Sequence, residues 1–141
     1  MLNSQSFPFL EVKDVYGDVD LVPNLPLTLS YRQRSINVFG LLDTGASVNV
    51  LPYSVGRDLG VIWEEQKLSV QLAGNLGRIE AKGVLLSAQV GNFQPVNLVF
   101  AWSQTDDVPI LLGRMNFFLE FDVCIYGARS LFELHPKFPV V

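Results

Sequence analysis

One short polar turn lies between two strongly apolar segments of this chain. The run Leu41-Leu42-Asp43-Thr44-Gly45-Ala46-Ser47 joins residues 38–42 to residues 48–51, and both segments are typical of buried strands. Aspartate, threonine and glycine favour turns, so the triplet alone would also suit an ordinary surface loop. An ordinary loop, however, has no reason to be entered and left by apolar strands. The context indicates a turn held against a β-rich core, with the carboxylate of Asp43 at its start. No second copy of this turn occurs.

The remaining sequence predicts an all-β domain. Its segments are short, rich in Val, Leu, Ile and Phe, and separated by Gly, Pro and Asn. With 141 residues, 49% of them apolar and 17% charged, the chain can bury one core. One short helix is predicted over residues 114–119, where Met115, Phe118 and Leu119 can share a face, and one helical turn within residues 52–59. Strands are predicted over residues 7–13, 27–32, 36–42, 48–51, 67–73, 78–90, 93–101, 110–112, 121–126 and 131–134.

Composition argues against several classes of function. The net charge is −4 and the basic residues are scattered, which argues against a nucleic-acid partner. The only histidine, His135, is expected to be a solvated tail residue, and the only cysteine, Cys124, a buried core thiol on a strand. They provide no cluster for a metal ion and no basis for a Ser-His-Asp or Cys-His mechanism. A lone cysteine excludes an internal disulfide and favours a reducing compartment.

Membrane and targeting signals are not seen in the sequence. The longest apolar stretch, residues 96–102, is too short to cross a bilayer, and residues 1–6 lack the basic start and apolar run of a signal peptide. We therefore expect a cytoplasmic protein with no membrane partner, although a piece of a longer protein would look the same. Asp106 and Asp107 are interpreted as a solvated loop, and Trp63 and Trp102 as packing residues.

A second motif lies in the last third of the chain, where Val108-Pro109-Ile110-Leu111-Leu112-Gly113-Arg114 forms an apolar strand that ends in Gly-Arg before the expected helix. Together and in this order, the two motifs resemble the retropepsin-like aspartic peptidases, the single-lobed dimeric relatives of pepsin. The resemblance covers roughly residues 27–135, and the final hairpin is most similar to cellular and bacterial members. It implies a closed, all-β barrel lobe of the pepsin/retropepsin kind with one short helix in the C-terminal half.

The resemblance also implies roles for individual residues. Asp43, Thr44 and Gly45 match the catalytic triplet of the family, in which the aspartate is the catalytic carboxylate. The Thr44 hydroxyl is expected to brace the opposite loop across a dimer axis, and Gly45 gives the turn its conformational latitude. Gly113 and Arg114 match the Gly-Arg pair that supports the active-site loop from behind.

Two further segments are expected to bind substrate. Ala46 and Ser47 follow the catalytic triplet and are expected to line the substrate site. The segment Leu72-Ala73-Gly74-Asn75-Leu76-Gly77 falls where the family has its flap, a glycine-bearing hairpin that closes over the bound peptide. On its residues alone, the same segment fits an ordinary hairpin tip equally well.

The expected chemistry needs two copies of the chain. Catalysis by paired carboxylates requires two aspartates about 3 Å apart that share one proton, and one chain carries a single such turn. We therefore expect a homodimer that hydrolyses internal bonds of an extended peptide or protein, without a cofactor or metal ion. The alternative is a catalytically inactive dimerisation or peptide-binding module with the same fold. Ser47 keeps that alternative open, because viral retropepsins commonly carry an acid there that helps to hold the arginine; its replacement leaves the partner of Arg114 unidentified.

The domain organisation expected from these motifs has three parts. Residues 1–26 are an N-terminal extension, whose removal could change activity, and its residues 14–26 are expected to form a proline-containing loop. Residues 27–135 form the peptidase domain. Residues 136–141 are a C-terminal tail.

Overall fold

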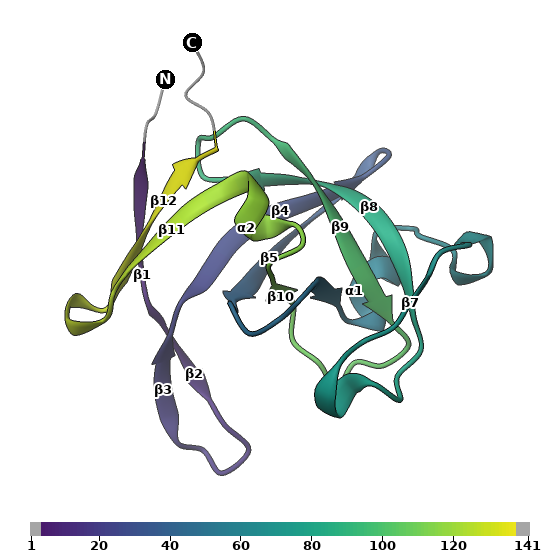
Figure 1. Cartoon of the computed structure of the whole chain (residues 1–141), viewed down its shortest axis with the longest axis horizontal. Coiled ribbons are helices and arrows are strands. Elements are labelled where there is room, and N and C mark those ends of the chain that lie inside the picture. The colour runs from purple at the N-terminus through teal and green to yellow at the C-terminus, as the bar shows by residue number, and fades with distance from the viewer. Residues whose placement is uncertain (1–3, 138–141) are drawn as a thin grey trace.

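The computed structural model describes residues 4–137, which fold around a closed β-barrel (Figure 1). Six strands close the ring in the order β4, β5, β10, β6, β9 and β8, because β8 also pairs with β4. A short strand, β7, adds to the free edge of β8. The predicted closed, all-β barrel is therefore confirmed. The strands are β4 (Asn24–Tyr31), β5 (Arg34–Leu42), β6 (Asn49–Leu51), β7 (Ser69–Val70), β8 (Ala81–Val90), β9 (Val96–Ser103) and β10 (Leu111–Leu112).

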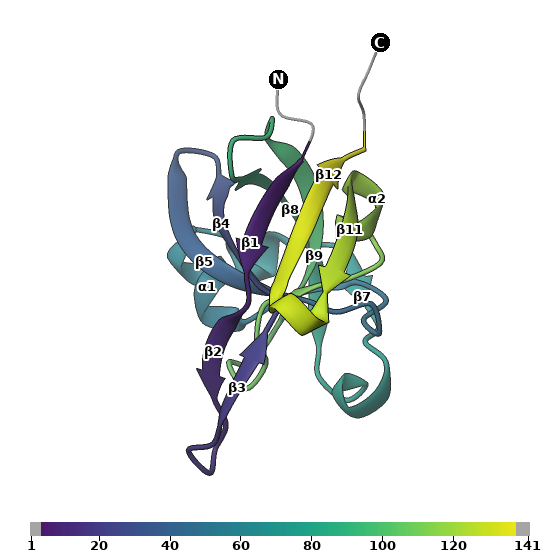
Figure 2. The ribbon, with the colours of Figure 1, turned by 90° about the vertical axis from the view of Figure 1, so that its left-hand side faces the viewer.

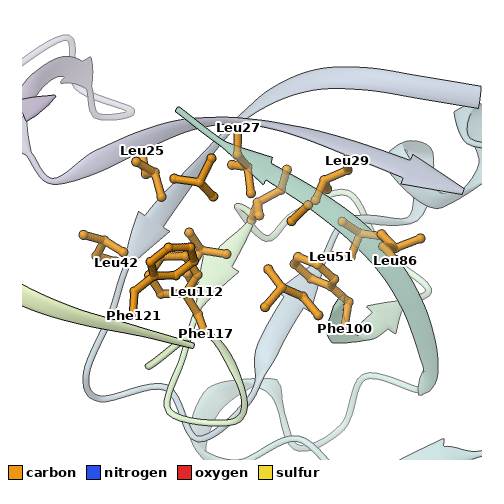
Figure 3. Packing of buried hydrophobic residues seen from close by; sticks show 14 of the residues in the cluster. Leu25, Leu27, Leu29, Leu42, Leu51, Leu86, Phe100, Leu112, Phe117 and Phe121 are labelled. Atoms are coloured by element: carbon orange, nitrogen blue, oxygen red, sulfur yellow. The ribbon is translucent and has the colours of Figure 1, made fainter. Parts of the chain in front are cut away.

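Two-residue alternation of apolar side chains builds the core of the barrel. In β4, Leu25, Leu27 and Leu29 are 0–4% exposed, whereas the residues between them face outward or are only partly covered. This is the period of a strand with one buried face. Burial of each such side chain contributes about 1.5–3 kcal/mol. Figure 3 shows these leucines packing against side chains from the other strands, among them Leu51, Leu86, Phe100 and Leu112.

A second, three-stranded sheet joins the two ends of the described chain. Its strands are β1 (Gln5–Pro8), β12 (Leu131–Pro136) and β11 (Phe121–Tyr126), in that order. Phe7 of β1 stacks on Phe132 of β12 at 5.5 Å between ring centroids. Part of the expected N-terminal extension is therefore built into the fold. Residues 1–3 of that extension, and residues 138–141 of the expected tail, lie outside the described residues.

The loop predicted over residues 14–26 is confirmed for residues 14–18 and wrong beyond them. Residues 10–22 form a hairpin of β2 (Leu10–Lys13) and β3 (Val19–Val22), and β4 already begins at Asn24. Pro23 and Pro26 misled the prediction because prolines commonly interrupt strands. Pro26 is tolerated because the pairing of β4 with β8 covers only Leu27–Ser30. On that side, no strand needs the missing N–H of Pro26.

The helices are short. They are α1 (Tyr53–Asp58), α2 (Phe117–Glu120) and three 3₁₀ turns: η1 (Trp63–Glu65), η2 (Gly74–Leu76) and η3 (Gly127–Arg129). The helix predicted to start at residue 114 starts three residues later, because the N–H groups of Arg114 and Met115 bond to the loop at residues 46–47. Its buried face is also different: Phe117 is fully buried, whereas Met115 and Leu119 are more than half exposed.

Two predictions about single residues are wrong as well. Cys124 is exposed, since β11 turns Phe121 and Val123 towards the core instead. His135 is not a tail residue but a half-buried member of β12, with Nε2 2.6 Å from Glu133 Oε1. Trp63 and Trp102 are buried in the core, as predicted.

Asp106 is exposed, as predicted, and it has a structural contact. Its Oδ1 accepts a hydrogen bond of 2.7 Å from the backbone N–H of Ser54 at the start of α1. That bond, with a second from the Ser54 hydroxyl, holds the pKa of the Asp106 carboxyl below its usual range. Across residues 4–137, no helix combines the length and the apolar character needed to traverse a membrane.

Candidate active site

The two sequence motifs meet at the end of β5. β10 lies parallel to β5, with Leu111 opposite Leu41 and Leu112 opposite Leu42, and its other edge pairs with β6. Asp43 follows directly, and its N–H donates to the Leu112 carbonyl at 3.0 Å. The half-buried Asp43 is therefore fixed at the carboxyl end of a strand that neighbours hold in place.

The turn itself orients the carboxylate. The Gly45 N–H donates to Asp43 Oδ1 at 2.9 Å, and the Ala46 N–H donates to the Asp43 carbonyl at 3.1 Å. A side chain at Gly45 would place its Cβ 3.1 Å from Asp43 Oδ1, which is a tight contact. Glycine thus lets the backbone come close to the acid, while Thr44 and Gly45 stay exposed.

Arg114 supports this turn through hydrogen bonds to its main-chain oxygens. Its Nη1 donates to the carbonyl oxygen of Thr44 at 2.6 Å. Its backbone N–H donates to the Ala46 carbonyl at 3.0 Å, and that of Met115 donates to the Ser47 carbonyl at 2.9 Å. The partner of Arg114, which the sequence left open, is therefore a main-chain oxygen, and no acidic side chain at position 47 is needed to hold the arginine.

Gly113 packs its backbone against the same turn. A Cβ at this position would lie 2.6 Å from the Val48 carbonyl oxygen and 2.7 Å from that of Ala46. Both neighbours are backbone atoms, so they cannot move aside as a flexible side chain would. Only glycine fits here without displacing the turn.

Two amide side chains that sequence reasoning missed complete the support. Asn49 is fully buried; its Oδ1 accepts from the Gly113 N–H at 2.8 Å, and its Nδ2 donates to the Val99 carbonyl at 3.1 Å and to Asn116 Oδ1 at 3.2 Å. Asn116 also accepts from the Val99 N–H and donates to the Asn97 carbonyl. The two side chains link β6 and β9 to residues 113–116. The sequence did contain a signal for this support, because Asn49 is a polar residue within the otherwise apolar run 48–51.

The predicted flap segment connects β7 to β8, which pair as antiparallel strands. Its tip is the 3₁₀ turn η2, with Gly74 at φ +62°, and not a tight two-residue hairpin turn. Leu72 is buried, whereas Ala73 and Asn75 are exposed. Among the hydrogen bonds found within residues 4–137, none joins this segment to residues 43–47. Hydrogen bonds therefore bring residues 43–47 together with Gly113 and Arg114. Leu72 and Leu76 of the flap candidate belong instead to a hydrophobic cluster with Val48 and Val50, the residues that follow the turn.

Replacing Arg114 by methionine should loosen the turn. The change keeps the aliphatic stem but removes the bond to the Thr44 carbonyl, and we expect a loss of about 1 kcal/mol in unfolding free energy. Amide hydrogen exchange should become faster at residues 44–47, as measured by mass spectrometry. Arg57→Met, a change at another exposed arginine, is the control; equal exchange in both variants would contradict a supporting role for Arg114.

The chain is similar to solved structures of two proteases. The solved structure of a retropepsin-like aspartic protease from Rickettsia conorii superposes with a TM-score of 0.61 at 18% identity, covering 94% of this chain and 93% of that chain. EIAV protease in complex with the inhibitor HBY-793 gives a TM-score of 0.46 at 21% identity, over 66% of this chain and 82% of that one. No curated protein matches the sequence.

The family model described as aspartyl protease matches residues 34–116, which is more than half of the chain. The matched region contains the Asp43 turn, its Gly113-Arg114 support and the amide pair behind them. With the barrel described above, this match shows that the chain belongs to the aspartyl protease family and has the retropepsin-like fold.

Proposed function

We propose that the chain is an aspartic endopeptidase that acts as a homodimer, with its active site where two Asp43 turns meet on a two-fold axis. The observation that carries this proposal is the geometry of the turn at residues 43–47. The Gly45 N–H orients the Asp43 carboxylate, Arg114 holds the main chain of the turn, and hydrogen bonds to neighbouring strands fix the end of β5. A site of this kind is incomplete in one chain, because paired-carboxylate catalysis needs a second acid about 3 Å away. A symmetric dimer supplies it from the same residue.

The proposed reaction uses a water molecule held between the two Asp43 carboxylates. The ionised Asp43 carboxylate takes a proton from the water molecule while the water oxygen attacks the carbonyl carbon of the peptide. The Asp43 of the other chain, a neutral carboxylic acid, donates its proton to the carbonyl oxygen. Collapse of the tetrahedral intermediate then breaks the C–N bond as a carboxyl proton passes to the leaving nitrogen. No covalent intermediate and no cofactor take part. Two carboxylates so close share one proton, so the rate should peak at acidic to mildly acidic pH.

The remaining predicted site residues take supporting roles in this proposal. The exposed Thr44, whose carbonyl Arg114 holds, would extend its hydroxyl towards the opposite turn. Ala46 and Ser47 would contact an extended substrate strand, and residues 72–77 would close over it as a flap. The catalytic turn and its supports would lie within residues 27–135. Residues 1–26 and 136–141 would be only in part an extension and a tail, because β4 already begins at Asn24 and β12 ends at Pro136.

Activity should depend steeply on protein concentration. A monomer carries only half of the proposed site. The rate per chain should therefore fall when the protein is diluted below the dissociation constant of the dimer. The test measures cleavage of a mixed peptide library from about pH 4 into the alkaline range at a series of protein concentrations, with sedimentation equilibrium under the same conditions. A rate per chain that stays constant where the protein is monomeric would contradict the proposal, as would a pH profile that is flat from mildly acidic to alkaline conditions.

A further inference from the structure

The hairpin of β2 and β3, residues 10–22, stands away from the rest of the molecule; we call it the arm. Its strands pair with one another and with no other strand of residues 4–137. Figures 1 and 2 show it projecting beyond the barrel at the lower end of both views, the end that also carries the connection between β7 and β8. A two-stranded hairpin by itself is at best marginally stable. Most residues of the arm are exposed, so packing against a further surface would stabilise it.

The root of the arm is fixed beside the catalytic turn. Before the arm, the Phe9 N–H donates to the Ser130 carbonyl at 2.8 Å. After it, the Pro23 carbonyl accepts from the Leu42 N–H at 3.1 Å, and Asn24 pairs with Leu41. Leu42 is the residue before Asp43. The second strand of the arm therefore leaves the barrel next to the carboxylate.

The tip of the arm is a turn held by hydrogen bonds to Asp14. Asp14 Oδ1 accepts hydrogen bonds from the N–H groups of Tyr16 and Asp18, at 2.8 and 2.9 Å. Gly17, at φ +82°, donates its N–H to the Asp14 carbonyl at 3.1 Å. This turn presents Val15 and Tyr16 to solvent, with 92% and 87% of their surface exposed. Because the turn is already ordered, binding through these two side chains would lose little conformational entropy.

We propose that the arm is a dimerisation arm, whose Val15 and Tyr16 pack against the body of the second chain in the active dimer. The inference rests on the proposed function, since a partner is needed there to complete the site. Two Asp43 carboxylates about 3 Å apart bring the partner's turn next to the root of the arm. From that root the arm reaches roughly 17 Å, about five residues at strand spacing. Because the arm projects beyond its own barrel, the body of the partner would lie within its reach.

Charge favours contact with the body of the partner over contact between the two tips. The arm carries four acidic residues, Glu11, Asp14, Asp18 and Asp20, against the single lysine Lys13. Two such tips would repel each other at short range. Val19 and Leu21 of β3 are also exposed, by 54% and 47%, and they stand opposite Lys13 and Glu11 of β2.

The arms would supply a part of the dimer interface. A tyrosine as exposed as Tyr16 has on the order of 150–200 Å² of solvent-accessible surface. A symmetric dimer contains two such tyrosines, one from each chain. The pair would bury about 300–400 Å² of the roughly 1,200 Å² or more that a stable interface requires. The rest of the interface must come from the surfaces around the catalytic turns.

The first test compares dimer dissociation constants of full-length chains by sedimentation equilibrium. V15S/Y16S removes the apolar tip without adding charge, and we expect it to raise the dissociation constant at least tenfold. Ile62→Ser, at a 48% exposed residue between α1 and η1, is the matched control and should leave it unchanged. Both variants should keep the wild-type circular dichroism spectrum, because both sites are exposed.

The possible outcomes separate this inference from the proposed function. A dimeric wild type whose dissociation constant is unaffected by V15S/Y16S would overturn the arm and leave the peptidase proposal standing. A wild type that is monomeric at every concentration reached would overturn both.

A second measurement locates the contact. Benzoylphenylalanine replaces Tyr16, isotope-labelled and unlabelled chains are mixed, and the sample is irradiated in the presence of a peptide library. We expect cross-linked peptides that join a labelled and an unlabelled chain. Cross-links confined to single chains, or formed only with the added peptides, would overturn the proposal, and the latter would assign the arm to the substrate.

Discussion

Asp43→Asn should abolish peptide hydrolysis, with a loss of about 10³-fold or more in kcat, while the fold and the dimer remain. Asparagine has nearly the same shape and can still accept the Gly45 N–H, but it can neither take a proton from water nor donate one as an acid. General acid–base catalysis by one group typically contributes 10²- to 10⁴-fold, and in the proposed dimer both roles fall on Asp43, one from each chain. The measurement is kcat on the best peptide from the library, with circular dichroism and sedimentation to verify fold and assembly.

The control for this change is Asp107→Asn. Asp107 is an exposed aspartate in the loop before Pro109, and its loss should leave kcat at the wild-type value. Activity that survives in Asp43→Asn would instead support the inactive-module alternative, in which the aspartate is kept for its turn geometry alone.

Asn49→Leu should have the largest effect on stability. The leucine leaves the buried Gly113 N–H without its acceptor, and it leaves the partly buried Val99 carbonyl and Asn116 Oδ1 without their donor. Each buried polar group that loses its partner costs about 1–3 kcal/mol, so we expect a loss of roughly 2–5 kcal/mol in unfolding free energy. Urea denaturation monitored by tryptophan fluorescence measures it. Because Gly113 packs against the catalytic turn, kcat should fall as well.

The same substitution at an exposed asparagine is the control. Asn92→Leu, in the turn between β8 and β9, should change the unfolding free energy by no more than about 0.5 kcal/mol. If Asn49→Leu destabilises the protein no more than Asn92→Leu does, the amide pair is not the support described here.

The barrel was predictable because its strands carry one apolar face and one polar face. The three leucines of β4, which alternate with Pro26 and Thr28, illustrate this. The phase of a strand could not be predicted where every position is apolar. In Val123-Cys124-Ile125-Tyr126, nothing in the sequence says which side chains turn inward, and the prediction for Cys124 failed there.

The outline of the candidate site was also readable, while its supports were not. Asp43, Gly113 and Arg114 stand in two recognisable motifs, and the structure brings them together. The bond from Arg114 to the Thr44 carbonyl and the pairing of Asn49 with Asn116 join segments more than sixty residues apart. Such contacts depend on how the strands close into the barrel, which a local pattern does not specify. The start of α2 was misplaced for the same reason, since the catalytic turn holds residues 114–115.

A subunit-mixing experiment tests the central claim most directly, that two chains share one site. A fixed amount of wild-type chain is allowed to re-pair with increasing amounts of Asp43→Asn, and peptide cleavage is measured at each ratio. If both chains supply an essential carboxylate, the rate should fall towards zero as mixed dimers form, to about a tenth at a nine-fold excess by mass action. A rate that depends only on the amount of wild-type chain, or a dimeric wild type that cleaves no peptide, would contradict the account.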